Sequence, residues 1–302
     1  MNILLTGGTG FIGRRLCAAL LARNHDITVL SREPQHVRQK CGPRARPLAA
    51  VADWHTDEHF DAVINLCGEP IVDAPWTAAR RQRLRDSRVG VTQQLVEAIA
   101  RVRQKPAVLL SGSAIGIYGD TGDAAIDETV SPATDFAAQL CRDWEEVARG
   151  AERDGVRVCL LRTGLVLDPS GGLLGRMLLP FRFGLGARLG NGQQWMSWIA
   201  MADYIAALLM LLDHQEASGP FNMTAPQAVT NAQFTRQLAQ SLNRPAVFAA
   251  PSLILKLVLG QRAPMVLGGQ RVLPTHLQAL RYQFGHPELG EALLSMLVRR
   301  PS

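Results

Sequence analysis

The first thirteen residues, MNILLTGGTGFIG, constrain the fold more than any other part of this 302-residue chain. A short apolar run leads into a glycine-rich turn and then into a helix-like stretch, residues 14–23. Glycine is needed at three places: Gly7 permits a tight strand-to-helix turn, Gly10 lets the backbone approach a pyrophosphate, and Gly13 lets helix and strand pack closely. The opening therefore predicts a dinucleotide-binding turn.

Such a turn holds phosphate without a charged side chain. The first main-chain N–H groups of a helix lack partners, and the positive end of the helix dipole favours an anion there. The residues expected to contact the cofactor at this turn are Gly7, Thr9, Gly10, Phe11, Ile12 and Gly13.

Strand and helix patterns alternate along the first half of the chain, which predicts a parallel sheet covered by helices. The fold class is therefore α/β, a doubly wound, Rossmann-like parallel sheet with its ligand crevice at the carboxyl ends of the strands. The expected strands are Ile3–Thr6, Ile27–Ser31, Arg46–Ala49, Ala62–Leu66, Ala107–Ser111 and Val156–Arg162, and the expected helices between them are Phe11–Ala22, Ala78–Val102 and Asp135–Arg153.

The pattern changes after Leu167, which divides the chain into three parts. Residues 1–167 are expected to form the dinucleotide-binding domain, with later segments at about 196–225 packing back on it. Residues 168–240 form a substrate-side segment, glycine-rich over 183–194. Residues 241–302 form a small helical C-terminal domain, a packing cap over the crevice; helices are expected at Thr230–Leu242 and Pro251–Leu259.

Composition narrows the class of protein. Apolar residues make up 47% and charged residues 19%, which is typical of a folded enzyme-like chain. Five cysteines without C-x-x-C spacing indicate neither a disulfide framework nor a zinc site, and the histidines lack ligand spacing, so no metal is expected. No apolar stretch is long enough to span a bilayer and no targeting segment is visible, so we expect a cytoplasmic protein without a membrane partner.

The net charge of +6 suits phosphorylated small molecules. Nucleic acid is not expected as a partner, because no basic run is interleaved with aromatic residues. The second expected strand ends at Ser31 and Arg32, with no carboxylate to accept hydrogen bonds from an adenosine ribose. A guanidinium there favours a 2′-phosphate, so NADP(H) is the predicted cofactor, with Arg14 as a second phosphate contact. The alternative is that Arg32 is only a solvated loop residue, and Glu33 beside it weakens the prediction.

Further motifs resemble the short-chain dehydrogenase/reductase superfamily, in an atypical, extended-like subgroup called epimerase family proteins, with a small C-terminal domain of unassigned role. Asn65-Leu66-Cys67-Gly68 resembles the strand-four segment beside the cofactor, and Ser111 to Gly119 resembles the strand-five serine segment ending in Tyr-Gly. The resemblance implies the fold, the cofactor, and pairing into a homodimer through the long helices. The narrower motifs are Gly68-Glu69-Pro70-Ile71, Ser87-Arg88, Trp144-Glu145, Arg162-Thr163-Gly164, Gly192-Gln193, Trp198-Ile199, Pro220-Phe221-Asn222 and the stretch 269–274.

The sequence departs from this superfamily at its acid/base pair. Ordinary members use a tyrosine and a lysine four residues later, whereas no Y-x-x-x-K occurs in this chain. Phe136 and Leu140 stand where the pair is expected, and neither side chain can exchange a proton. The substrate-side motif of extended relatives is also altered, leaving only Asp203, which either caps the following helix or touches substrate.

The candidate catalytic residues are Ser113, Tyr118 and Glu69, each with a structural alternative. Ser113 donates to a substrate oxygen or is a turn hydroxyl bonded to backbone. Tyr118 is catalytic or belongs to a structural Tyr-Gly segment. Glu69 acts as acid or base if burial beside the cofactor raises its pKa, or is a carboxylate fixed by backbone amides.

Arg162 ends the sixth expected strand and is counted among the cofactor-side residues with Leu66, Cys67, Gly68 and Ser111. Its guanidinium can hold an anionic group, but pairing with a carboxylate such as Glu145 is favoured. Two hypotheses remain open. The chain is an NADP(H)-dependent oxidoreductase or epimerase-like enzyme acting on a small molecule, or it binds NADP(H) without catalysis as a redox sensor or interaction protein.

Overall fold

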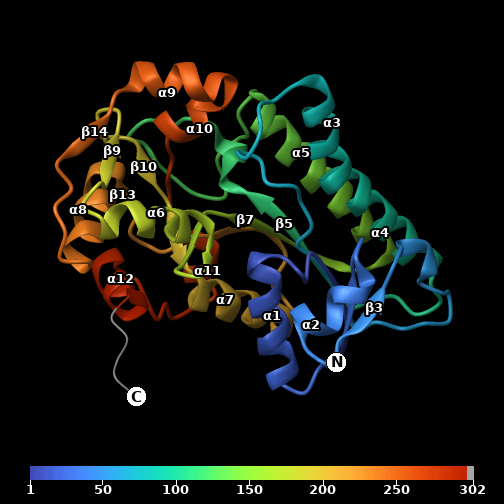
Figure 1. The fold of residues 1–302 in the computed structure, drawn as a ribbon. Helices are drawn as coiled ribbons and strands as arrows, with labels where there is room; N and C mark the ends of the chain where they lie inside the picture. The colour runs from blue at the N-terminus through green and yellow to red at the C-terminus, as the bar shows by residue number, and fades with distance from the viewer. Residues whose placement is uncertain (298–302) are drawn as a thin grey trace.

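The computed structural model describes residues 1–297 and confirms the predicted doubly wound α/β fold (Figure 1). Within these residues the main sheet has seven strands, all parallel, in the order β12-β7-β5-β4-β1-β2-β3. Its strands are β1 (Asn2–Thr6), β2 (Asp26–Leu30), β3 (Arg46–Leu48), β4 (Ala62–Asn65), β5 (Val108–Ala114), β7 (Arg157–Thr163) and β12 (Gly219–Met223).

Helices cover both faces of this sheet because successive strand residues point to opposite sides and both sets are apolar. On one face Leu5 and Ile64 pack with α1 (Phe11–Ala22) and α7 (Met201–Asp213); α2 (Val37–Cys41) lies on the same side. On the other face Leu4 and Leu109 pack with α4 (Val91–Arg101) and α5 (Phe136–Arg149). The strand order reverses between β1 and β4, which places the ligand crevice beside β1.

The expected helix over residues 78–102 is continuous but not uniform. It consists of α3 (Ala78–Arg85), a π-helical turn at Asp86–Gly90, and α4. Thr77 caps α3, its hydroxyl accepting a hydrogen bond from Arg80 N at 3.2 Å. A helical period alone does not reveal a single wider turn, so this feature was not predicted.

The C-terminal part is a smaller mixed region with its own apolar core, in which Trp198 and Phe234 are fully buried. Its helices are α6 (Gly172–Arg182), α8 (Asn231–Ser241), α9 (Ser252–Leu259), α10 (Ala263–Leu267), α11 (Thr275–Ala279) and α12 (Leu289–Leu297), with short strands β6 (Ala125–Ile126), β8 (Leu165–Asp168), β9 (Ala187–Leu189), β10 (Trp195–Met196), β11 (Trp198–Ala200), β13 (Val229–Thr230), β14 (Phe248–Ala250) and β15 (Arg271–Val272). The predicted domain 241–302 extends over residues 298–302, which lie outside the described residues.

Several elements were not expected from the sequence, and three of them shape the region around the crevice. β12 adds a seventh strand at the edge of the main sheet, beside β7. The glycine-rich stretch 183–194 contains β9, which pairs with β14 from the C-terminal region. Helix α6 precedes the glycine-rich stretch and occupies residues to which no element was assigned from the sequence. Isolated two- or three-residue strands depend on partners far along the chain, so local pattern does not predict them.

Asp203 does not cap the helix that follows it, and its contact with a substrate stays a prediction. It lies buried in the first turn of α7, and its carboxylate accepts hydrogen bonds from Gly285 N at 2.7 Å and His286 N at 2.8 Å. It therefore fastens the loop before α12 to the helix that packs on the sheet.

Within residues 1–297 no helix has the length and apolar character needed to cross a membrane.

We predict that Asp203→Ala lowers the free energy of unfolding by roughly 1.5–3 kcal/mol, because two main-chain donors lose a charged acceptor. Urea unfolding followed by circular dichroism measures the change. Asp213→Ala is the control on the same helix; Asp213 is exposed and pairs only with exposed Arg23, so its loss should cost under about 1 kcal/mol. Equal losses in the two variants would contradict this role for Asp203.

Candidate functional site

The glycine turn after β1 packs so closely against neighbouring backbone that a side chain would not fit at Gly7 or Gly13. Gly7 has a φ of +70°, and a Cβ at this position would lie 2.5 Å from the carbonyl oxygen of Leu66. A Cβ at Gly13 would lie 2.1 Å from the carbonyl oxygen of Gly7. Gly10 N donates to the same Gly7 oxygen at 3.0 Å. The turn thus packs against β4 and against the first turn of α1.

The N-terminus of α1 faces this turn without a cap. Gly10 is the capping residue. Within residues 1–297 no side chain accepts a hydrogen bond from the first main-chain N–H groups of the helix, and its first turn has no acidic residue. Main-chain N–H groups are therefore left for an anionic ligand. The Phe11 ring packs against the loop before α6. A Cβ on Gly171 or Gly172 would lie only 2.8–2.9 Å from ring atoms of Phe11.

The end of β2 carries the predicted ribose-side residues. Ser31 Oγ accepts a hydrogen bond from Glu33 N at 3.1 Å, so it orders its own loop. Arg32 Nη1 donates to Glu69 Oε1 at 3.0 Å, while the Arg32 side chain is 90% exposed. Arg14 Nε donates to Gly10 O at 3.3 Å. Two guanidinium groups consequently lie beside the glycine turn, and Arg32 is free to turn toward a ligand.

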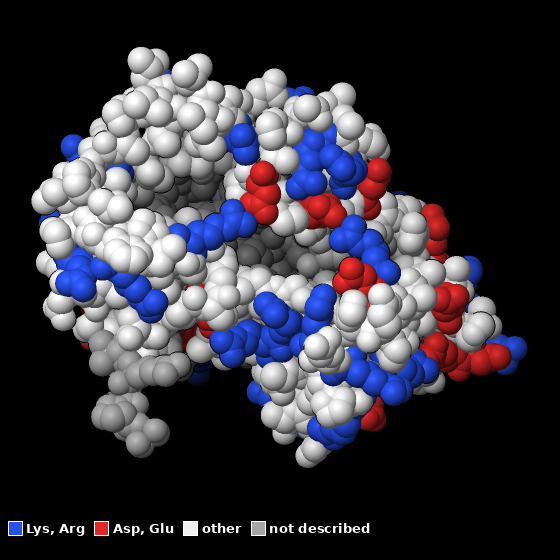
Figure 2. Space-filling view, viewed as in Figure 1, with Lys and Arg blue, Asp and Glu red and all other residues white. Residues whose placement is uncertain are grey.

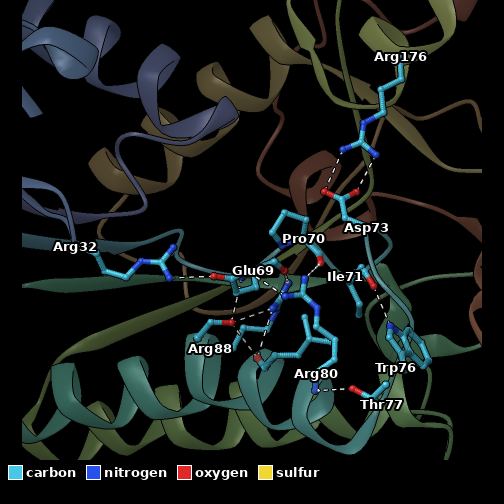
Figure 3. Close-up of polar contacts among 12 residues, drawn as sticks. Arg32, Glu69, Pro70, Ile71, Asp73, Trp76, Thr77, Arg80, Arg88 and Arg176 are labelled. Carbon is cyan, nitrogen blue, oxygen red and sulfur yellow. Dashed lines mark hydrogen bonds and ion pairs between the residues drawn. The ribbon is translucent and has the colours of Figure 1, made fainter. Parts of the chain in front are cut away.

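Glu69 is an ion-paired carboxylate. Besides Arg32, it accepts a hydrogen bond from Arg80 Nη1 at 3.2 Å, and the two guanidinium groups lower its pKa (Figure 3). The predicted raised pKa is therefore wrong, because the contacts favour the charged form more than partial burial opposes it. The backbone-amide alternative is also not observed for its side chain. Glu69 therefore holds the guanidinium groups of Arg32 and Arg80 in place, and its role toward a substrate stays a prediction.

A row of polar side chains crosses the sheet at the crevice end of β1, β4 and β5. The register aligns Thr6 with Asn65 and Asn65 with Ser111. Thr6 Oγ1 donates to Asn65 Oδ1 at 2.6 Å, and Asn65 Nδ2 donates to Thr92 Oγ1 at 2.8 Å. Cys67, just beyond, donates its thiol hydrogen to the same Asn65 oxygen, and burial raises the pKa of this thiol to about 11. These bonds fix the strand ends that pass beside the glycine turn.

Gly68 and Leu66 complete the strand-four segment. Leu66 contributes the carbonyl oxygen that lies against Gly7, and a Cβ on Gly68 would be 3.0 Å from the guanidinium carbon of Arg88. The segment Leu66–Gly68 therefore lies between the glycine turn and the π-helical turn. Whether these residues and Ser111 contact a cofactor stays a prediction.

A second row aligns Ser113 of β5 with Arg162 of β7, and Arg162 with Asn222 of β12. The Arg162 guanidinium forms two hydrogen bonds, each 2.9 Å, to the Glu145 carboxylate of α5, with both side chains buried. Ser113 Oγ donates to Glu145 Oε1 at 2.6 Å. The favoured structural pairing of Arg162 is thus confirmed. Ser113 is bonded to a side chain instead of to backbone, and its role toward substrate stays a prediction.

Tyr118 belongs to the same network. Its hydroxyl accepts a hydrogen bond from Arg162 Nη1 at 2.8 Å and donates to Asn222 Oδ1 at 2.8 Å. The side chain is 3% exposed, and burial raises its pKa. The hydroxyl therefore remains protonated at neutral pH.

The structure also shows the surroundings of Phe136 and Leu140, the positions at which the resemblance places the tyrosine–lysine pair. Phe136 begins α5 and meets Trp76 edge to face, with ring centroids 5.0 Å apart, while the Arg81 guanidinium lies 4.8 Å from its ring centroid. Leu140 is buried one turn later. Aromatic and apolar contacts thus surround the start of this helix, and the replacement of the proton-transfer pair by Phe136 and Leu140 stays a prediction.

Sequence reasoning missed several charged contacts that close the mouth of the crevice. Asp73 accepts two hydrogen bonds from the Arg176 guanidinium of α6, at 2.8 and 3.2 Å (Figure 3). Val72 O accepts a hydrogen bond from Arg262 Nη1 at 2.7 Å. Figure 2 shows the hollow between the two halves of the molecule, with basic and acidic side chains along its rim. The segment 69–77 therefore joins the sheet side to the C-terminal side. Its partners lie more than 100 residues away, so no local pattern indicated them.

Glu128 is a second functional candidate that the sequence did not indicate. It is buried, and its Oε1 accepts a hydrogen bond from Asn222 N at 2.9 Å. Its backbone oxygen accepts from Arg162 Nη1 at 3.2 Å. The loop carrying Glu128 thus supports the Arg162 network from the side of β12.

Family comparison agrees with this architecture. Residues 3–224 match the model described as NAD dependent epimerase/dehydratase family, and residues 250–296 match a domain of unknown function, DUF1731. The chain belongs to the NAD dependent epimerase/dehydratase family, and the resemblance to the atypical subgroup is confirmed. An epimerase family protein of Mycobacterium bovis is 42% identical over 96% of both chains.

Solved structures show the same relationship. The human epimerase family protein SDR39U1, crystallised with NADPH, is 36% identical, with a TM-score of 0.90 over 98% of this chain and 99% of the human one. A nucleoside-diphosphate sugar epimerase from Corynebacterium glutamicum is 29% identical, with a TM-score of 0.75, and this chain covers 58% of it. UDP-glucuronic acid 4-epimerase of Bacillus cereus, at 18% identity and a TM-score of 0.77, shares the fold.

We predict that Glu145→Gln lowers the free energy of unfolding by about 3–5 kcal/mol, because the buried Arg162 guanidinium loses its counter-charge. Thermal and urea unfolding measure the loss. Glu146→Gln, at an exposed position next to it on α5, is the matched control and should change stability by less than about 0.5 kcal/mol. A small effect of Glu145→Gln would mean that the pair is not what holds the strand ends.

Proposed function

We propose that this protein is a cytoplasmic NADP(H)-dependent oxidoreductase or epimerase-like enzyme, acting on a small molecule held in the crevice under the C-terminal region. The observation that carries the proposal is the uncapped start of α1 at the glycine turn, with exposed Arg32 beside it. The human relative crystallised with NADPH supports the choice of cofactor.

The residues present fit such a cofactor. The main-chain N–H groups of the turn Gly7–Gly13 would hold the pyrophosphate, because the contacts at Gly7 and Gly13 leave no room for side chains in the turn. Arg32 and Arg14 would hold a 2′-phosphate, for which a planar guanidinium is well suited. When bound, the nicotinamide supplies hydride transfer.

The chain's own groups supply orientation and a proton. Ser113 and Tyr118 bring two hydroxyls to the carboxyl ends of the strands, and Glu145 and Arg162 fix both of them. A tyrosine kept neutral by burial is in the protonation state that a proton donor needs. Its hydrogen bond to Asn222 Oδ1 must open before that proton reaches a substrate.

A second function is favoured by one specific observation. Phe136 and Leu140 replace the usual pair with apolar packing, so the chain fits a protein that binds NADP(H) without turnover and reports the redox state or recruits a partner. A sensor must bind the reduced and oxidised cofactors with different affinity, because equal affinities shift no equilibrium.

Turnover distinguishes the two functions. Purified protein incubated with NADPH or NADP⁺ and a panel of carbonyl, alcohol and nucleotide-sugar compounds is expected to turn over at least one compound. Oxidation or reduction is read from the cofactor absorbance at 340 nm, and epimerisation, which returns the hydride to the substrate, is read as a new isomer by NMR. Tyr118→Phe should reduce that rate by at least tenfold while NADPH affinity stays within about twofold. Absence of turnover across the panel, together with unequal affinities for NADPH and NADP⁺, would instead support the sensor.

Cofactor preference tests Arg32 directly. We predict that Arg32→Ala weakens NADPH binding by at least tenfold and leaves NADH binding unchanged, because a charge-assisted bond of about 1.5–3 kcal/mol to the 2′-phosphate is lost. Fluorescence titration of both nucleotides measures the two affinities. Arg38→Ala, at an exposed arginine of α2, should have no effect. An unchanged preference in Arg32→Ala would end this assignment.

A further inference from the structure

A second cavity, of about 510 Å³, lies in the C-terminal region. Its walls are formed by β9 with the loop that follows it and by α8 with the residues after it. No residue of the glycine turn or of the Arg162 network lines it. α8 and β9 lie together on the C-terminal side of the molecule, apart from α1 (Figure 1). The polar side chains of its lining are Arg188, Asn191, Gln193, Arg236, Gln240 and Arg244.

Three arginines give the cavity its charge. Arg188 Nη1 donates to Asn191 O at 2.8 Å, and Arg244 Nε donates to Arg182 O at 2.8 Å. These bonds hold two guanidinium groups in place through backbone oxygens and leave their other N–H groups available. Among residues 1–297, no carboxylate lines the cavity or forms an ion pair with any of its three arginines. Three positive charges around one hollow favour an anion.

Thr235 is a buried polar residue among those that line the cavity. It lies on α8, lines the same cavity and is 3% exposed. Within the described residues its hydroxyl oxygen has no hydrogen-bond partner. The hydroxyl oxygen is itself inaccessible, so it borders the cavity without facing a ligand.

The cavity is formed in advance of binding. Gly192 has a φ of +73°, and a Cβ there would lie 2.9 Å from the Cβ of Ala232. Ala232 N donates to Gly192 O at 2.8 Å, which locks the loop after β9 on the start of α8. Thr230 and Gln233 cap that helix start reciprocally. The helix N-terminus is thus already satisfied, and the preference for an anion comes from the arginine side chains.

We propose that this cavity binds a phosphorylated small molecule, with two or more phosphate oxygens held by Arg188, Arg236 and Arg244. Guanidinium groups bind phosphate oxygens in pairs, and the volume lies within the range of small-molecule sites. The matched family regions end at residue 224 and resume at 250, so α8 falls between them and no family description assigns this site. The inference does not depend on the proposed function.

Isothermal titration with pyrophosphate as the probe tests the site, at 150 mM salt and with saturating NADPH so that the glycine turn is occupied. One binding event per chain is expected. The double variant Arg236→Gln/Arg244→Gln should weaken it by at least tenfold, and Arg236→Lys, which keeps the charge, should weaken it less. Arg101→Gln, at an exposed arginine of α4, is the matched control and should have no effect.

Thermal unfolding of each variant without ligand verifies that the fold is retained. No binding to the wild-type chain, or binding that the double variant leaves unchanged, overturns the proposal. If NADPH does not bind, the proposed function fails but this inference can still be tested. Pyrophosphate is then titrated without NADPH into the wild-type chain and the double variant, and weaker binding to the double variant assigns the pyrophosphate to this cavity.

Discussion

The ion pair between Arg162 and Glu145 is the interaction on which the rest of the crevice depends. It joins a sheet strand, β7, to a covering helix, α5, in a buried setting, and both its members also bond to neighbouring hydroxyls. Burying two charges is favourable only when each has close partners, so the surrounding hydrogen bonds are part of its stability. The strand ends that carry the candidate hydroxyls are positioned by this pair.

The sheet is well predicted from the sequence because each strand is indicated by residues that are close together in the chain. The apolar strands, the glycine turn and the helix Phe11–Ala22 follow from spacing and from steric need within about twenty residues. Glu69 shows the limit of such reasoning. Its pKa depends on Arg32 and Arg80, which a residue list does not place around it. β12, β9 and the Asp73–Arg176 contact likewise depend on residues distant in the chain, so packing had to be seen before they could be described.

The arginines of this chain have different roles in different places, and the net charge of the whole chain does not distinguish them. Arg162 is buried and neutralised, Arg32 is exposed and held by a single carboxylate, and Arg236 faces a cavity without acidic lining. The first stabilises the fold, and the other two remain available to anions. The balance between positive charge and nearby carboxylates therefore separates structural arginines from binding ones.

The π-helical turn at Asp86–Gly90 sets the rotational phase between two halves of one long helix. One extra residue in a turn rotates everything before it by about 100° relative to everything after it. Arg80 thereby reaches Glu69, while Thr92 faces the sheet and bonds to Asn65. Deleting a single residue from this turn would restore ordinary helical winding and carry Arg80 off the carboxylate, with no change to any residue that touches a ligand.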